Sequence, residues 1–439
     1  MFDSESYRAW HGTAPMADFF RVSDPGMFLV SGTDCTVRDQ AGREYLDARS
    51  SMWNVTLGYS CEPVKAALHA QIDMLPSGTV MRYEHPTAIA AEYASRLADC
   101  LPSPLDYIRF GNTGSQMTEA AAMLSRFYRL MTGEAGRDLV ITVTGSYHGT
   151  GPLATALTGE PVLQKYSGPL DRLVRHVDTP PEQVHDPAQC DGSCVAEVTD
   201  LIEQLGADQV TAVMVEPVLG TFVRPVPLHY LDRLTVECRA RGIHVIADEV
   251  TTGVGRAGGM TVSERLTHTP DMLVLGKGLS AGYFPLAALA VSRDIYTELA
   301  RSEHRIGFLN GSTTDGHPLG MAAGLAVLEL ITKPDFFPGV REAAAYLRDT
   351  LTERLADEPA VGTVGGEGMM LGVALHHPDG TGWSVNEVNR LRLACRDHRL
   401  LTSFSLGVLP LLPPLTISRS DCGVLADRLR EALHAVTDR

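Results

Sequence analysis

The sequence is short of positive charge. Its 439 residues carry 37 lysines and arginines against 53 aspartates and glutamates, which gives a formal net charge of -16. Nucleic acids and anionic membranes are bound largely through lysine and arginine. The composition therefore predicts a protein whose partners are neither nucleic acids nor membranes.

The sequence also has no secretory signal and no cysteine framework. It starts Met-Phe-Asp-Ser-Glu-Ser, without a basic region followed by an apolar core. Its eight cysteines are scattered, as expected for reduced thiols. Cys190 and Cys194 lie near His185, but the spacing fits no standard zinc motif and a fourth ligand is missing. We expect a cytoplasmic protein without a metal site.

Repeats and low-complexity runs are absent, and the hydrophobic share of 44% is ordinary for a globular protein. A chain of 439 residues is too long for one simple core. We predict an N-terminal arm over residues 1–54 that forms part of a small domain, a large domain over 55–332, and the rest of the small domain over 333–439.

Two patterns in the middle of the chain imitate other kinds of site. Gly253, Gly255 and Gly258 match the dinucleotide fingerprint G-x-G-x-x-G, but they do not directly follow a strand and no helix start follows them. The run Leu273–Val291 is apolar enough to suggest a membrane span, yet it contains Lys277 and four glycines or prolines. We predict neither a nicotinamide site nor a span, and interpret the run as strand, turn and strand.

A carboxylate and a lysine follow two of the apolar strands. Asp248 ends the run His-Val-Ile-Ala, and Lys277 follows Met-Leu-Val-Leu between two glycines. Burying either charge alone is costly, so such a pair usually has a partner or a function. A lysine amine in an apolar pocket can form a Schiff base with an aldehyde, and a carboxylate can keep a pyridine nitrogen protonated. We infer a pyridoxal 5'-phosphate site in which Lys277 and Asp248 are catalytic.

Strands and helices alternate around this pair. The runs LVITV, VTAVMV and HVIAD are almost continuously apolar, which is typical of a parallel sheet covered by helices on both faces. Ligands of such α/β folds lie at the carboxyl ends of the strands. Ser115, Tyr147, Glu216 and Asp248 all fall there.

The segments IADEVTTGVGRAG and DMLVLGKGLSAGYFPLAAL resemble the core of the class III (omega) pyridoxal-phosphate aminotransferases. Further motifs follow the family's order over nearly the whole chain. The resemblance implies the fold-type-I architecture of α/β class, with a large domain whose mostly parallel sheet is covered by helices and a smaller α/β domain made of both termini. It also implies small-molecule amine and carbonyl substrates, and a homodimer with active sites shared between subunits.

The resemblance assigns the cofactor contacts. The Gly-Ser turn before a helix grips the phosphate, which suits the positive end of a helix dipole. An aromatic ring stacks on the pyridine, a valine packs on its other face, and a Gly-Ser-Thr segment reaches the partner's phosphate. The residues implied are Gly114, Ser115, Tyr147, His148, Glu216, Asp248, Val250, Lys277, Ser312 and Thr313. Gln116, Met123 and Thr314 depart from the commoner family pattern.

The substrate pocket departs further. By resemblance, Met52, Trp53, Tyr147 and Phe404 line it. Many relatives hold a substrate carboxylate with an arginine before the Pro-Pro of the small domain, but residues 400–412 contain no basic residue. Thr221 stands where some relatives carry a glutamate that holds this arginine. Unless Arg82 or Arg224 helps, we expect a specialised biosynthetic substrate without a carboxylate beside its carbonyl.

Other activities share the cofactor motifs. Aminomutases of the glutamate-semialdehyde type and decarboxylases of the same fold cannot be separated from transaminases by these motifs. The decarboxylases fit less well, since Met52 stands where they carry a glutamine. A non-catalytic pyridoxal-phosphate protein would need a broken lysine site and a DNA-binding appendage, and the sequence has neither.

The remaining elements are predicted from patterns alone. Apolar and polar residues alternate around turns at 32–34 and 40–42, which indicates a hairpin. Residues 160–200, rich in proline and polar residues, indicate a mostly irregular excursion. In the small domain we expect helices over 340–355 and 385–400, strands over 369–375 and 413–416, and a final helix.

Overall fold

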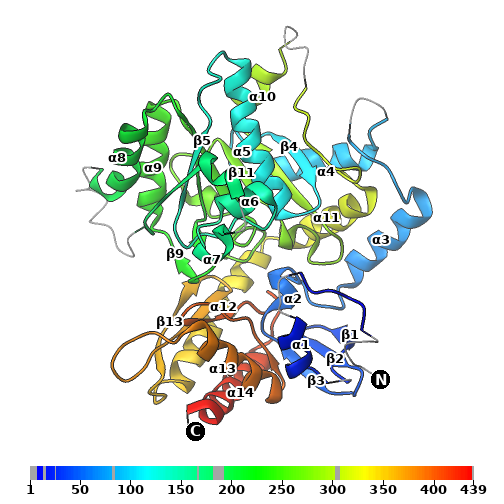
Figure 1. The fold of residues 1–439 in the computed structure, drawn as a ribbon. Coiled ribbons are helices and arrows are strands. Elements are labelled where there is room, and N and C mark those ends of the chain that lie inside the picture. Colours follow the sequence, from blue (N-terminus) through cyan, green and yellow to red (C-terminus); the bar gives the residue numbers. More distant parts are fainter. Residues whose placement is uncertain are drawn as a thin grey trace.

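A seven-stranded sheet lies at the centre of the larger part of the molecule (Figure 1). The computed structural model describes residues 7–12, 16–24, 26–81, 85–165, 168–180, 192–301 and 307–437. The strands, in their order across the sheet, are β4 (Tyr107–Gly111), β12 (Ala287–Val291), β11 (Met272–Leu275), β10 (His244–Glu249), β7 (Val210–Val215), β5 (Leu139–Val143) and β6 (Val174–Val177). Strand β12 is antiparallel to both neighbours, and the other pairings described in this sheet are parallel. The mostly parallel sheet is confirmed.

Helices cover both faces of this sheet, because its strands are apolar on both sides. Ile246 of β10 packs into the same core as helix α5, whereas its neighbours Val245 and Ala247 pack into the cores of the opposite face. The helices of this part are α3 (Glu62–Met74), α4 (Ala88–Ala98), α5 (Gly114–Met131), α6 (Pro152–Leu157), α7 (Pro161–Gln164), α8 (Ala196–Leu205), α9 (Leu228–Ala240), α10 (Arg293–Leu299) and α11 (Pro318–Ile331). A short hairpin, β8 (Val218–Leu219) with β9 (Arg224–Pro225), extends toward the small domain.

The small domain is built from both ends of the chain, as predicted. In Figure 1 the blue N-terminal segment lies beside the orange and red C-terminal helices. Leu46 and Ala48 share one hydrophobic core with residues between Val340 and Leu433, and Leu46 pairs with Leu400 in parallel strands. Its elements are α1 (Met16–Val22), β1 (Leu29–Thr33), β2 (Thr36–Asp39), β3 (Glu44–Asp47), α2 (Ser50–Trp53), α12 (Phe336–Arg354), β13 (Val361–Glu367), β14 (Met370–Leu375), α13 (Val385–Asp397), β15 (Leu400–Leu401), β16 (Val408–Leu411) and α14 (Arg419–Thr437). The boundaries at residues 54 and 332 stay a prediction.

The strand expected over residues 413–416 is wrong. The strand is β16, which pairs with β14 at one edge of a three-stranded sheet. Pro413 and Pro414 have no N–H to donate to a ladder, so a strand cannot continue through both. The segment instead joins the N-terminal arm, because the N–H of Leu412 donates to Ala48 and that of Leu415 donates to Thr56.

The excursion over residues 160–200 is more ordered than predicted. It contains the short helix α7 and strand β6, which completes one edge of the main sheet. A four-residue edge strand leaves little periodicity in the sequence, and this explains the error. Cys190 and His185 lie outside the described residues. Within the described part, no helix combines the length and the apolar character needed to cross a bilayer.

Candidate active site

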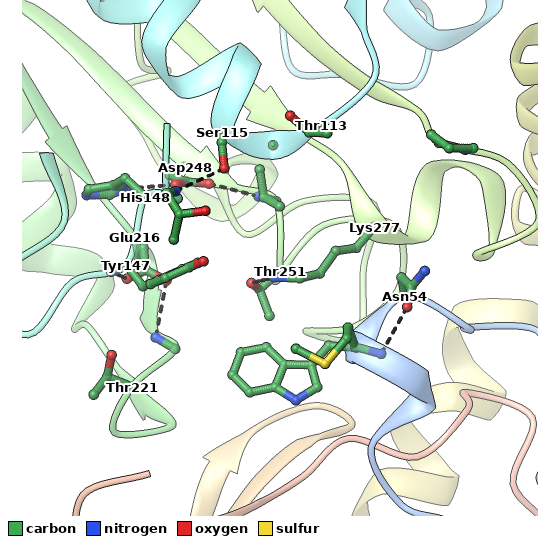
Figure 2. A pocket seen from close by; sticks show the side chains of 18 of the residues that line it. Asn54, Thr113, Ser115, Tyr147, His148, Glu216, Thr221, Asp248, Thr251 and Lys277 are labelled. Carbon is green, nitrogen blue, oxygen red and sulfur yellow. Dashed lines mark hydrogen bonds and ion pairs between the residues drawn. The ribbon is translucent and has the colours of Figure 1, made fainter. Parts of the chain in front are cut away.

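A cavity of about 620 Å³ opens where the carboxyl ends of the parallel strands face the small domain (Figure 2). This is the position at which α/β sheets of this kind bind ligands. Eleven of the predicted site residues line it. They are Met52, Trp53, Gly114, Ser115, Tyr147, His148, Glu216, Asp248, Val250, Lys277 and Phe404.

Lys277 begins a 3-10 turn directly after β11 and points into this cavity. Its Nζ donates a hydrogen bond of 2.6 Å to Thr251 Oγ1 and lies 5.1 Å from the centre of the Trp53 ring. Enclosure by protein atoms lowers the pKa of Lys277 to about 8, although the nearby carboxylates Asp248 and Glu216 oppose this. About half of the amine is therefore neutral, and so nucleophilic, at a pH of about 8.

Asp248 is held at the end of β10 by two contacts. Its Oδ2 lies 2.7 Å from His148 Nδ1, and its Oδ1 accepts the N–H of Val250 at 3.1 Å. His148 is held in turn, because its backbone N–H donates to Thr158 Oγ1 at 2.9 Å. Both side chains are buried, at 5% and 2% exposure. The result is a buried carboxylate, held by two contacts, that lines the cavity and suits a cationic ring nitrogen.

Glu216 fixes two neighbouring segments of the cavity wall. Its Oε1 accepts the N–H of Tyr147 at 2.8 Å, and its Oε2 accepts the N–H of Gly220 at 3.2 Å. Burial raises the pKa of this carboxyl group above its ordinary value. Tyr147 remains 41% exposed and lies beside Glu216 in Figure 2.

The N-terminus of α5 also reaches the cavity, which Gly114 and Ser115 line. Thr113 caps the helix by accepting the N–H of Gln116 at 3.1 Å, and Ser115 Oγ accepts the N–H of Thr150 at 3.2 Å. A Cβ on Gly114 would lie 2.8 Å from Val250 Cγ1, so only glycine leaves this space open. Free N–H groups and the positive end of a helix dipole suit a phosphate. The site therefore fits pyridoxal phosphate at its phosphate, ring nitrogen and aldehyde ends.

Two predicted residues do not line the cavity. The Ser312 hydroxyl donates to Asp315 Oδ1 and accepts from Asn112 Nδ2, both at 2.6 Å. Thr313 is exposed. Neither contributes to the cavity of its own chain, and their predicted contact with a partner's phosphate stays a prediction.

Arg82 and Arg224 are the two arginines suggested to replace the missing carboxylate-binding arginine. Arg224 does not line the cavity, since it donates to the carbonyl of Pro180 at 2.9 Å and its guanidinium lies 6.0 Å from the Phe222 ring centre. Arg82 lies outside the described residues.

Sequence reasoning missed several residues of the cavity. Thr251 is the most important, since it binds the amine of Lys277. Its place directly after Val250 was a usable signal, but a threonine in a glycine-rich turn has many structural uses. The other missed lining residues include Thr150, Leu163, Gly220, Ser280, Phe284, Pro285, Leu286 and Ser405.

Comparison with known proteins agrees with this geometry. The family model "Aminotransferase class-III" matches residues 21–433. The omega-aminotransferase of Caulobacter vibrioides is 31% identical over 93% of each chain, and the diaminobutyrate–2-oxoglutarate transaminase of Halomonas elongata is 28% identical over 100% of this chain and 96% of its own.

Solved structures extend the likeness to three dimensions. An (S)-enantioselective omega-transaminase from Thermomicrobium roseum has a TM-score of 0.91 at 28% identity, covering 98% of this chain and 97% of its own. A PLP-bound amine transaminase from an uncultivated Pseudomonas species has a TM-score of 0.89 at 29% identity, covering 98% and 99%. The chain belongs to the class III aminotransferases, enzymes that depend on pyridoxal phosphate.

Proposed function

We propose that this enzyme transfers an amino group between an amine and an aldehyde or ketone that has no carboxylate beside its carbonyl, such as a larger biosynthetic intermediate. The observation that carries the proposal is the absence of an anchor for such a carboxylate. Among the described residues that line the cavity, Lys277 is the one lysine or arginine. An arginine would be the usual partner of a carboxylate, because its planar fork pairs both oxygens.

The cavity wall around Phe404 and Ser405, in the segment that lacks an arginine, is held by hydrogen bonds between neutral groups. Ser405 Oγ donates to the carbonyl of Thr221 at 2.5 Å, and Trp53 Nε1 donates to Ser403 Oγ at 3.0 Å. The polar groups of this wall are thus paired with one another, and they offer no charge. A substrate carboxylate placed there would lose its hydration without gaining a cation.

The mouth of the cavity is apolar. Met52 and Phe404 are 70% and 44% exposed as whole residues, although both line the cavity. An apolar ligand that covers these groups removes apolar surface from water, which stabilises the complex by roughly 25 cal/mol per Å². This arrangement favours an apolar or extended substrate.

The cofactor residues have the following proposed roles. Pyridoxal phosphate supplies an electron-accepting ring when bound. Gly114 and Ser115 would hold its phosphate, Tyr147 and Val250 its ring, and Glu216 would lie near its phenolic oxygen.

Two residues have proposed catalytic roles. Asp248 would keep the ring nitrogen protonated. Lys277 Nζ would bind the aldehyde carbon and be released when the substrate amine takes its place. The free amine would then carry a proton between the substrate carbon and the cofactor as base and acid.

Half-reactions with paired amines test the substrate proposal. The holoenzyme is mixed with phenylalanine or 2-phenylethylamine, with alanine or ethylamine, and with glutamate or 4-aminobutyrate, and the loss of the visible cofactor band is followed. Each pair differs only by the carboxylate beside the amine. We expect the amine without this carboxylate to react faster in every pair. Faster reaction of all three amino acids would overturn the proposal.

A further inference from the structure

The pocket-lining segment Ser50–Trp53 has an unfavourable backbone. Ser50, Ser51 and Trp53 have φ angles of 47°, 60° and 69°, in the left-handed region that L-residues rarely adopt. Three such residues within four positions persist only where the surroundings hold them. This segment presents Met52 and Trp53 to the cavity, so whatever holds it also shapes the substrate site.

Asp47 holds the segment from one side. Its Oδ1 accepts the N–H of Arg49 at 3.0 Å, and its Oδ2 accepts the N–H of Ser51 at 2.7 Å and the hydroxyl of Tyr59 at 2.5 Å. The residue is 1% exposed. One buried carboxylate therefore fixes the backbone on both sides of Ser50.

Arg256 holds the segment from the other side. It follows β10 in the large domain and is 1% exposed. Its Nη1 donates to the carbonyls of Met369 at 3.1 Å and Pro413 at 2.5 Å, and its Nη2 donates to Ser50 Oγ at 3.4 Å. The guanidinium thus joins the large domain to the small domain and to the strained segment.

The charge of Arg256 is unusual for a buried group. The structure describes no ion pair for it, and its Nε has no hydrogen-bond partner among the described residues. Burial lowers the pKa of Arg256 to about 9, and Asp47 opposes this shift, so the group stays mostly charged at neutral pH. A cation buried at this cost usually has a function.

That charge also acts on Lys277. The pKa of Lys277 is lowered first by burial and further by Arg256, against the carboxylates Asp248 and Glu216. Asp248 lies at the end of β10, Glu216 directly follows β7, and Arg256 lies in the turn after β10. Arg256 therefore favours the neutral, reactive amine.

We propose that Asp47 and Arg256 are positioning residues for transamination, which clamp the strained segment from two sides and so hold Met52 and Trp53 opposite Lys277. The inference rests on the proposed use of this cavity for amine substrates. It does not depend on whether the substrate carries a carboxylate, because the test uses whichever donor the wild type prefers.

The test compares four variants with the wild type. Arg256→Lys keeps the charge but loses the planar fork, and Arg256→Met removes both. Ser50→Ala keeps the charge but removes the contact with Arg256, together with the bond of 2.7 Å that Ser50 Oγ donates to the carbonyl of Leu412. Arg265→Met is the control, because Arg265 also bridges the two domains, through an ion pair of 2.7 Å with Glu367, but its described bond does not reach the strained segment. Thermal midpoint, kcat and KM for the amine donor are measured for each. The pH midpoint for capture of pyridoxal phosphate by stripped protein is measured as well.

We expect KM to rise about tenfold in both Arg256 variants and about threefold in Ser50→Ala, because small displacements of a pocket wall weaken binding strongly. The capture midpoint should move to higher pH by about half a unit in Arg256→Met alone, since removal of a positive charge raises the pKa of the Lys277 amine. Arg265→Met should leave KM and the midpoint unchanged. Lower thermal midpoints with unchanged KM in Arg256→Lys and Ser50→Ala would overturn the proposal, whether or not Arg256→Met folds.

Discussion

His148 Nδ1, in the loop after β5, lies 2.7 Å from Asp248 Oδ2 at the end of β10, and both residues are buried. This contact leaves Asp248 little freedom, so its carboxylate is presented to the cavity in one orientation. A buried carboxylate held in this way stabilises a nearby cation strongly, because few water molecules screen the charge.

Asp248→Asn tests the role of that charge. The amide keeps the shape and can still contact His148, so the fold and the visible colour should remain. Turnover should fall about a hundredfold or more, because an amide cannot keep the cofactor nitrogen protonated. Single-turnover rates and the absorption spectrum separate the two effects. Unchanged turnover would remove Asp248 from the catalytic residues.

Capture of the cofactor should depend on pH through Lys277. The neutral amine is the reactive form, so the capture rate should increase with pH and level off above the lowered pKa of about 8 rather than above the ordinary value of 10.5. Stopped-flow absorption of stripped protein with pyridoxal phosphate measures this rate. Lys277→Ala is the control, and it should show neither the lysine-bound band nor turnover at any pH. A wild-type protein that stays colourless would contradict the assignment.

Gly114 should be intolerant of a side chain. A Cβ there would lie 2.8 Å from Val250 Cγ1, so Gly114→Ala must displace either the Val250 side chain or the N-terminus of α5. We expect pyridoxal phosphate to dissociate about tenfold more readily, because the N–H groups no longer converge on one phosphate position. Gly136→Ala is the control, since nothing lies within 4 Å of its added Cβ. Equal cofactor affinity of the two variants in equilibrium dialysis would contradict the prediction.

The sequence predicts the centre of the fold well, for physical reasons. Strands such as β7 and β10 are buried along their whole length, so their apolar runs are unbroken and end at polar residues. Because strand ends converge at one edge of a parallel sheet, Glu216 and Asp248 could be assigned to one cavity before any distance was known. The carboxylate and lysine at two strand ends also identified Asp248 and Lys277 as a pair, and the resemblance added Ser312, Thr313 and the phosphate and ring-stacking roles of Ser115 and Tyr147.

What the sequence does not predict depends on contacts between distant segments. Arg256 is an ordinary arginine in a glycine-rich turn until Met369 and Pro413 are folded onto it. The strained φ angles of Ser50 and Trp53 leave no compositional trace, because neither is a glycine. The Thr251 contact to Lys277 likewise arises from the meeting of two turns that follow different strands.

Assembly provides the last prediction. Ser312 and Thr313 lie outside the cavity of their own chain, although the family resemblance assigns them to a phosphate site. We therefore predict a twofold dimer in which Thr313 of the partner subunit completes each site. Thr313→Glu should weaken cofactor binding by repelling the phosphate, while Lys277→Ala abolishes turnover.

Mixed dimers of these two variants decide the question. In a mixed dimer, the site that keeps Lys277 receives an intact Thr313 from the Lys277→Ala chain. Random pairing makes about half of the dimers mixed, each with one intact site of two, so about a quarter of wild-type activity should return. The measurement is activity after unfolding and refolding the two variants together, with sedimentation to verify that dimers form. Recovery should be absent when the variants are refolded separately and then combined. Mixed dimers without recovered activity, or a catalytically competent monomer, would show that each chain builds its site alone.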